Sequence, residues 1–136
     1  MPEHTINVAT ADGIMPVFAA FPAEGETFAV VVLYMDFWGV REELFGLARH
    51  VSARGYMCLV PDFYYRQGKV RPVIRDAQGK VVSLKKLDEK TLNEVLAPVH
   101  ALSDDMVVAD TGALLDFLGH EPSARPGSMG CIGYCL

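Results

Sequence analysis

The feature that most restricts the fold is the run of apolar and aromatic residues at positions 28–35, FAVVVLYM. A strand with one face in water alternates apolar and polar side chains, whereas a strand covered on both faces is apolar throughout. Strands of the second kind lie inside the sheets of α/β proteins, between two layers of helices. A chain of 136 residues is long enough to bury such a core and forms one domain at most.

The residues that follow predict a right-handed βαβ unit. Apolar side chains recur at the spacing of an amphipathic helix, at Leu44, Leu47, Ala48 and Val51. The next apolar run, at 56–60, has the length of a short buried strand. A strand, a helix and a second strand joined by short turns pair the two strands in parallel.

Three further elements are expected on either side of this unit. Runs 5–10 and 15–21 predict a hairpin that turns at Asp12-Gly13. A helix is expected from its N-cap at Ser103 to residue 118. The apolar residues in run 128–133 then predict a buried strand.

The segment 63–102 between these elements is the least regular part of the sequence. Residues 70–84 could form a hairpin that turns at Gln78-Gly79. Residues 91–97 predict a short helix that ends at Pro98, because proline has no N–H to continue the helical bonding.

Composition excludes several classes of partner. The net charge of −5 argues against nucleic acid, which needs a basic surface. No apolar run approaches the roughly 20 residues of a membrane span, so we expect no membrane partner.

The N-terminus lacks a basic region followed by an apolar one, and three cysteines cannot all pair. Both features predict free thiols in a cytoplasmic protein.

The last four residues, Gly133-Tyr134-Cys135-Leu136, match the first half of a nucleophile elbow. That motif consists of a strand, the pattern Gly-x-nucleophile-x-Gly, and a helix. The glycine before the nucleophile and the preceding apolar run are both present. Since Gly-x-Cys also occurs by chance, a small buried thiol at the end of a strand is the alternative.

Several segments, taken in order, resemble the dienelactone hydrolase family over essentially the whole chain. They are 10–16 (TADGIMP), 32–39 (VLYMDFWG), 53–56 (ARGY), 59–66 (LVPDFYYR) and 130–136 (GCIGYCL). The resemblance implies an α/β-hydrolase fold, with a mixed, mostly parallel sheet and helices on both faces. Residues 1–136 would be the N-terminal part of a single domain that ends at the elbow. The implied activity, like that of carboxymethylenebutenolidase, is hydrolysis of a lactone or carboxylic ester without a cofactor or metal.

The resemblance also implies roles for individual residues. Cys135 matches the cysteine nucleophile, and the backbone N–H groups of Phe37 and Leu136 match the two oxyanion-hole donors. Asp36 stands where the family typically has a glutamate that contacts the resting thiol, and it is one methylene shorter. Arg66 matches a family position, although a structural ion pair would explain it equally well.

The triad partners of the nucleophile are not in this sequence. In α/β-hydrolases the acid and then the histidine follow the nucleophile. All four histidines precede Cys135, namely His4, His50, His100 and His120. The implied partners are therefore a small ester or lactone substrate and a further C-terminal polypeptide that supplies Asp and His after residue 136.

Two alternatives stay open. The first is a thiol redox or binding protein that uses Cys135 and Cys131, and the second is an inactive fragment. Positions four apart on a strand are roughly 13 Å from each other, which disfavours a disulfide. We expect Cys131 and Cys58 to pack in the core.

Overall fold

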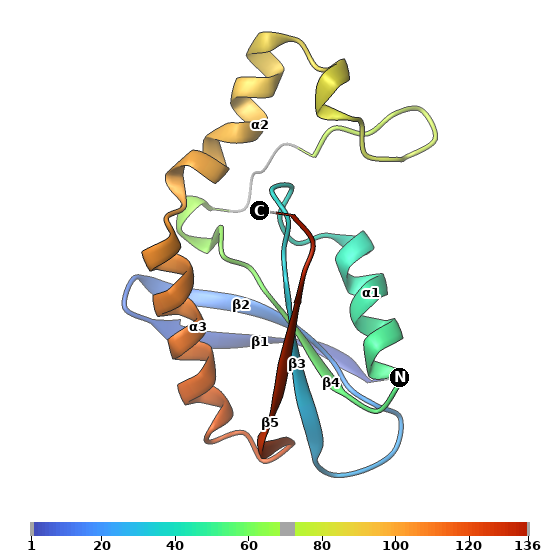
Figure 1. Ribbon diagram of the computed structural model, residues 1–136, viewed down its shortest axis with the longest axis vertical. Helices are drawn as coiled ribbons and strands as arrows, with labels where there is room; N and C mark the ends of the chain where they lie inside the picture. The colour runs from blue at the N-terminus through green and yellow to red at the C-terminus, as the bar shows by residue number, and fades with distance from the viewer. Residues whose placement is uncertain (1, 69–72, 136) are drawn as a thin grey trace.

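The computed structural model describes residues 2–68 and 73–135. In this part of the chain, five strands form one mixed sheet (Figure 1), in the order β1 (Glu3–Thr10), β2 (Gly13–Ala20), β4 (Met57–Pro61), β3 (Phe28–Tyr34) and β5 (Ala124–Gly133). Strands β3, β4 and β5 run parallel, and the β1–β2 hairpin is antiparallel to them through β2. The expected mixed sheet, with helices on both faces, is confirmed.

The N-terminal hairpin joins β1 (Glu3–Thr10) to β2 (Gly13–Ala20) at the expected turn. Gly13 has φ of 141°, a conformation that residues with a Cβ rarely adopt. The Thr10 hydroxyl donates to the Gly13 carbonyl at 2.9 Å and closes the turn. Strand β2 then pairs with β4 (Met57–Pro61), which carries the hairpin into the sheet.

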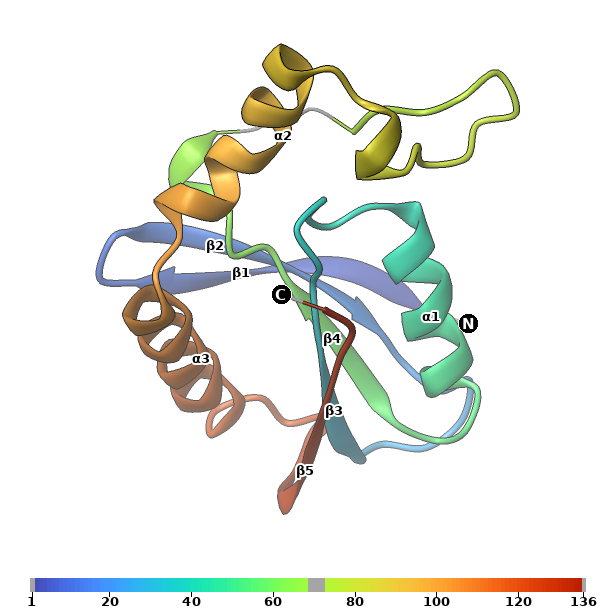
Figure 2. The same cartoon turned by 45° about the horizontal axis from the view of Figure 1, so that its top comes forward.

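The central strand β3 (Phe28–Tyr34) has helices on both sides, as its apolar sequence predicts. Helix α1 (Glu42–Ser52) packs on one face through Leu44 and Ala48, which are buried. Helix α3 (Asp104–Leu118) lies on the other face (Figure 2). The Tyr34 hydroxyl reaches it and is 3.1 Å from the Thr111 hydroxyl.

The two predicted helix boundaries after residue 90 have different outcomes. Ser103 caps α3 as expected, since its hydroxyl accepts from the Met106 N–H at 3.2 Å. The end predicted at Pro98 is wrong, because α2 (Glu89–Ala101) continues through that proline. Pro98 leaves the helix without one hydrogen bond to the carbonyl four residues earlier, but Val99 after it packs against the core.

The hairpin predicted over 70–84 is seen only in part. Residues 70–72 lie outside the described residues. Beyond them, Arg75 and Val81 form an antiparallel bridge, and Gly79 has φ of 79° in the expected turn. A 3-10 turn at Leu84–Lys86 follows.

Strand β5 (Ala124–Gly133) begins earlier than predicted and is mostly exposed. The expectation of a buried strand is therefore wrong for this chain. Within the described residues β5 is the edge of the sheet and pairs only with β3. Cys131 lies on this edge and is exposed, so its predicted place in the core is also wrong, whereas Cys58 is fully buried.

Candidate functional site

The turn after β3 and the end of β5 lie at the same edge of the sheet. The two strands are parallel, and Tyr34 pairs with Gly133 in the last step of their register. Asp36 and Cys135 each come two residues after this pair, at the carboxyl ends of the strands. Figure 1 shows β3 and β5 running side by side towards the same edge of the sheet. This arrangement is the one expected for an elbow cysteine beside the turn that carries Phe37.

The backbone of Cys135 has a strained conformation. Its φ of 69° is the one positive value at a residue other than glycine in the described part of the chain. A side chain at positive φ is unfavourable, and strain of this kind is typical of nucleophile elbows. The thiol is exposed. A Cβ at Gly133 would lie 3.9 Å from the Tyr34 Cβ, an ordinary contact, so the described neighbours do not themselves require glycine there.

The turn after β3 is held by hydrogen bonds along its whole length. The Trp38 N–H donates to the Asp36 carboxylate at 3.1 Å, and the Gly39 N–H donates to the Asp36 carbonyl at 3.0 Å. The Tyr64 hydroxyl donates to the Phe37 carbonyl at 2.8 Å. These bonds fix the peptides on both sides of Phe37. Leu136, the other expected oxyanion donor, lies outside the described residues.

Asp36 binds an arginine in this structure. Arg41 donates to its two carboxylate oxygens at 2.6 and 2.9 Å, and the aspartate also caps the Trp38 N–H. Among the described residues no hydrogen bond joins Asp36 to Cys135. The short aspartate side chain bonds within its own turn, which disfavours the expected contact with the resting thiol.

Arg66 forms ion pairs with two aspartates, Asp110 and Asp12. Its guanidinium donates to both carboxylate oxygens of Asp110, at 2.8 and 2.9 Å, and to Asp12 at 2.7 Å. The guanidinium also lies over the Tyr65 ring, 4.7 Å from its centroid. The hydrogen bond to Asp110, which is buried, raises the pKa of Arg66. Of the two readings of Arg66, these contacts favour the structural one, since the ion pair joins α3 to the β1–β2 turn.

Sequence reasoning missed two residues that shape the site, Tyr64 and Arg41. Tyr64 stands in the segment 59–66 that carries the family resemblance, and this position was the available signal. No pattern in the sequence distinguishes Arg41 from a solvated arginine at the start of α1. The four histidines are exposed. Burial raises the pKa of the Cys58 thiol to about 12, so this thiol is unsuited to nucleophilic work at neutral pH.

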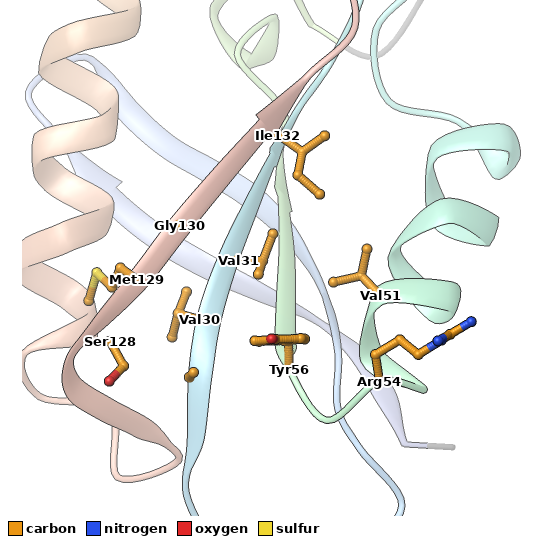
Figure 3. Close-up of a pocket in the computed structure, with 10 residues that line it drawn as sticks. Val30, Val31, Val51, Arg54, Tyr56, Ser128, Met129, Gly130 and Ile132 are labelled. Carbon is orange, nitrogen blue, oxygen red and sulfur yellow. The ribbon is translucent and has the colours of Figure 1, made fainter.

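An apolar hollow of about 560 Å³ lies on the sheet between α1 and β5. Figure 3 shows Val51 and Tyr56 across from Val31 and Ile132. Neither Asp36 nor Cys135 lines it. The hollow is therefore an uncovered part of the sheet face, lined by other residues than the edge that holds Asp36 and Cys135.

The described residues contain neither a metal-binding cluster nor a membrane-spanning helix. Within 2–68 and 73–135, no group of three or more His, Cys, Asp or Glu side chains is placed to hold a metal ion. In the same ranges, no helix has both the length and the apolar character needed to cross a bilayer.

Comparison with known proteins establishes the family. The sequence model of the dienelactone hydrolase family matches residues 15–136. The chain belongs to the dienelactone hydrolase family. A protein of Methylorubrum extorquens with the provisional name carboxymethylenebutenolidase is 27% identical over 130 residues, which cover 96% of this chain and 40% of that protein.

Two solved structures show the fold. A protein of Klebsiella pneumoniae subsp. pneumoniae MGH 78578, provisionally named a dienelactone hydrolase, superimposes with a TM-score of 0.74 at 21% identity. A cold-adapted esterase from an Arctic intertidal metagenomic library superimposes with a TM-score of 0.63, also at 21% identity. Each match covers 98% of this chain and 50% of the other. The α/β-hydrolase fold expected of a dienelactone hydrolase is confirmed. The chain spans 40% of the length of the curated relatives that it matches.

Proposed function

We propose that residues 1–136 are the N-terminal part of a single α/β-hydrolase domain that cleaves a lactone or carboxylic ester, with Cys135 as nucleophile. The observation that carries the proposal is the positive φ of Cys135 at the sheet edge that also holds the Phe37 turn. A relaxed thiol that only fills space has no need of this strained geometry.

In the proposed reaction the Cys135 thiolate attacks the carbonyl carbon of the substrate. A C–S bond forms while the carbonyl π electrons move to oxygen, which gives a tetrahedral oxyanion. Collapse of this intermediate breaks the ester C–O bond, and the departing alkoxide takes up the proton that the Cys135 thiol gave to the triad histidine when the thiolate formed. Water then attacks the acyl-enzyme, releasing the carboxylic acid and the thiol.

The oxyanion would be bound by the backbone N–H groups of Phe37 and Leu136. For Phe37 the proposal is supported by the hydrogen bonds that fix the peptides on both sides of it. Preorganised donors of this kind stabilise the transition state because they need no rearrangement when charge develops.

The triad Asp and His would come from polypeptide after residue 136. An unactivated thiol is only a few per cent thiolate at neutral pH, and the exposed histidines precede the elbow. Support comes from the 40% coverage of the curated relatives and from the uncovered apolar face beside β5. That polypeptide would cover the face and complete the site.

The test is turnover of p-nitrophenyl acetate by the full-length protein and its cysteine variants. Cys135→Ala should abolish turnover while changing stability little. The matched control is Cys131→Ala, another exposed free thiol four residues away, which should retain activity. Equal loss of activity in both variants would favour the two-cysteine redox reading.

A further inference from the structure

Tyr64 links the carboxyl ends of two neighbouring strands. It follows β4, and its hydroxyl donates to the carbonyl of Phe37 in the turn that follows β3, at 2.8 Å. The side chain is only 1% exposed. Its own N–H donates to the carboxylate of Asp62 at 3.0 Å, and Asp62 is also buried. A buried and anchored tyrosine is a rigid support for the turn it contacts.

The hydrogen bonds of this turn determine the direction of the Phe37 N–H. The N–H and C=O groups of a trans peptide point in opposite directions. In the Asp36–Phe37 peptide, the carbonyl accepts from the Gly39 N–H at 3.0 Å, so the Phe37 N–H points away from the inside of the turn. Within the described residues this N–H has no hydrogen-bond partner, so it is available to a ligand.

The next peptide, Phe37–Trp38, is held at both ends. Its N–H donates to the Asp36 carboxylate at 3.1 Å, and its carbonyl accepts from Tyr64. If the hydroxyl were absent, this peptide would be held from one end only. The Phe37–Trp38 peptide could then rotate about the Phe37 Cα–C bond. A compensating rotation about the Phe37 N–Cα bond would tilt the Phe37 N–H.

We propose that Tyr64 is a positioning residue for the oxyanion hole, acting through the Phe37–Trp38 peptide. The inference rests on the proposed function, in which the Phe37 N–H binds the oxyanion. Hydrogen bonds weaken with misalignment, and a tilted donor loses most where charge has developed, in the transition state. Tyr64 should therefore affect kcat and leave substrate binding nearly unchanged.

The decisive variant is Tyr64→Phe in the full-length enzyme, since it removes one oxygen and keeps the buried ring. We expect kcat for p-nitrophenyl acetate to fall roughly tenfold, less than the 10²–10³-fold that follows loss of an oxyanion donor itself. KM should stay within about twofold, because uniform binding is untouched. The matched controls are Tyr34→Phe and Tyr65→Phe, whose hydroxyls contact Thr111 and Asp110 instead of the turn, and both should retain the wild-type kcat.

Two probes separate the oxyanion hole from the thiol. A trifluoromethyl ketone adds to the cysteine as an anionic tetrahedral adduct, so its affinity should fall in Tyr64→Phe by the same factor as kcat/KM. Alkylation of Cys135 by iodoacetamide displaces iodide and forms no oxyanion at a carbonyl carbon, so its rate should equal that of the wild type. A parallel fall in alkylation would mean that Tyr64 acts on the thiol or on the fold, and would overturn the inference.

The inference and the proposed function fail in different ways. Activity that survives Cys135→Ala would refute the proposed function. Wild-type kcat in Tyr64→Phe, with Cys135→Ala inactive, would refute only the role of Tyr64. If Tyr64→Phe does not fold, Asp36→Ala removes the other anchor of the same peptide. It should give the same loss of kcat with unchanged alkylation, and wild-type kcat there would equally overturn the inference.

Discussion

Arg41 binds both carboxylate oxygens of Asp36, with nitrogen–oxygen distances of 2.6 and 2.9 Å. The same guanidinium donates to the Gly39 carbonyl at 2.9 Å, so it spans the turn from its first residue to its fourth. The pair is largely shielded from solvent, with side-chain exposures of 12% for Arg41 and 18% for Asp36. We infer that this aspartate organises the turn that carries Phe37.

Removal of the carboxylate charge tests this role against contact with the resting thiol. Asp36→Asn should weaken the bidentate pair with Arg41 and lower kcat several-fold, and Arg41→Gln should do the same, because both variants loosen one turn. The rate of Cys135 alkylation by iodoacetamide, followed against pH, should be the same in both variants and the wild type. A profile displaced in Asp36→Asn alone would show that the aspartate acts on the thiol.

The ion pair between Arg66 and Asp110 should contribute to stability and leave catalysis unaffected. Arg66→Met would leave the Asp110 carboxylate buried without its cation, and breaking a buried pair in this way costs about 3–5 kcal/mol. We expect a loss in the lower part of this range, because the Tyr65 hydroxyl still donates to Asp110. Urea unfolding measures the change.

Its control is Asp12→Asn, which removes the exposed partner of the same arginine. The free energy of unfolding should then change by no more than about 0.5 kcal/mol. The activity per folded molecule should be that of the wild type in both variants. A reduced kcat in Arg66→Met with unchanged unfolding would instead place Arg66 in the reaction.

The fold was predictable because it depends on periodicity. Backbone sterics and burial favour one element in each of three patterns: the all-apolar run that forms β3, the helical spacing in α1 and α3, and the turn at Gly13. Their order along the chain then leaves few possible topologies. Pro98 was placed wrongly because its local penalty is outweighed by tertiary packing of Val99, which no local pattern contains.

The site was predictable only in part, because its geometry depends on contacts between distant segments. The elbow pattern predicted Cys135 as the nucleophile, and the parallel pairing of β3 with β5 brings the end of β5 to the sheet edge that also holds the Phe37 turn. The bond between Tyr64 and Phe37 joins residues 27 positions apart, and periodicity carries no information about such a pair. The exposure of Cys131 follows from its place on an edge strand, which its apolar sequence did not reveal.

The buried Cys58 thiol should make stability depend on pH in alkaline solution. Burial raises its pKa from 9.0 to about 12, so the folded state keeps the proton where the unfolded state loses it. The contribution of this thiol to stability is full below pH 9 and is lost as the pH rises from 9 towards 12. The free energy of unfolding of the wild type relative to Cys58→Ala should fall by up to about 1.4 kcal/mol per pH unit in that range. A difference that stays constant from pH 8 to 10.5 would contradict the prediction.

The exposed edge strand β5 predicts how residues 1–136 behave when they are expressed alone. Its side chain at Met129 is 45% exposed and adjoins the apolar hollow beside α1. An uncapped strand next to an apolar face pairs readily with another chain. We therefore expect association, seen by sedimentation velocity as a mass that rises with concentration.

Met129→Lys should reduce this association, because a charged lysine on an edge strand opposes pairing. Ile14→Lys, at a position that is 57% exposed in the β1–β2 hairpin, is the matched control and should leave association unchanged. A chain that stays monomeric and unfolds cooperatively would show that the edge needs no further polypeptide to cover it.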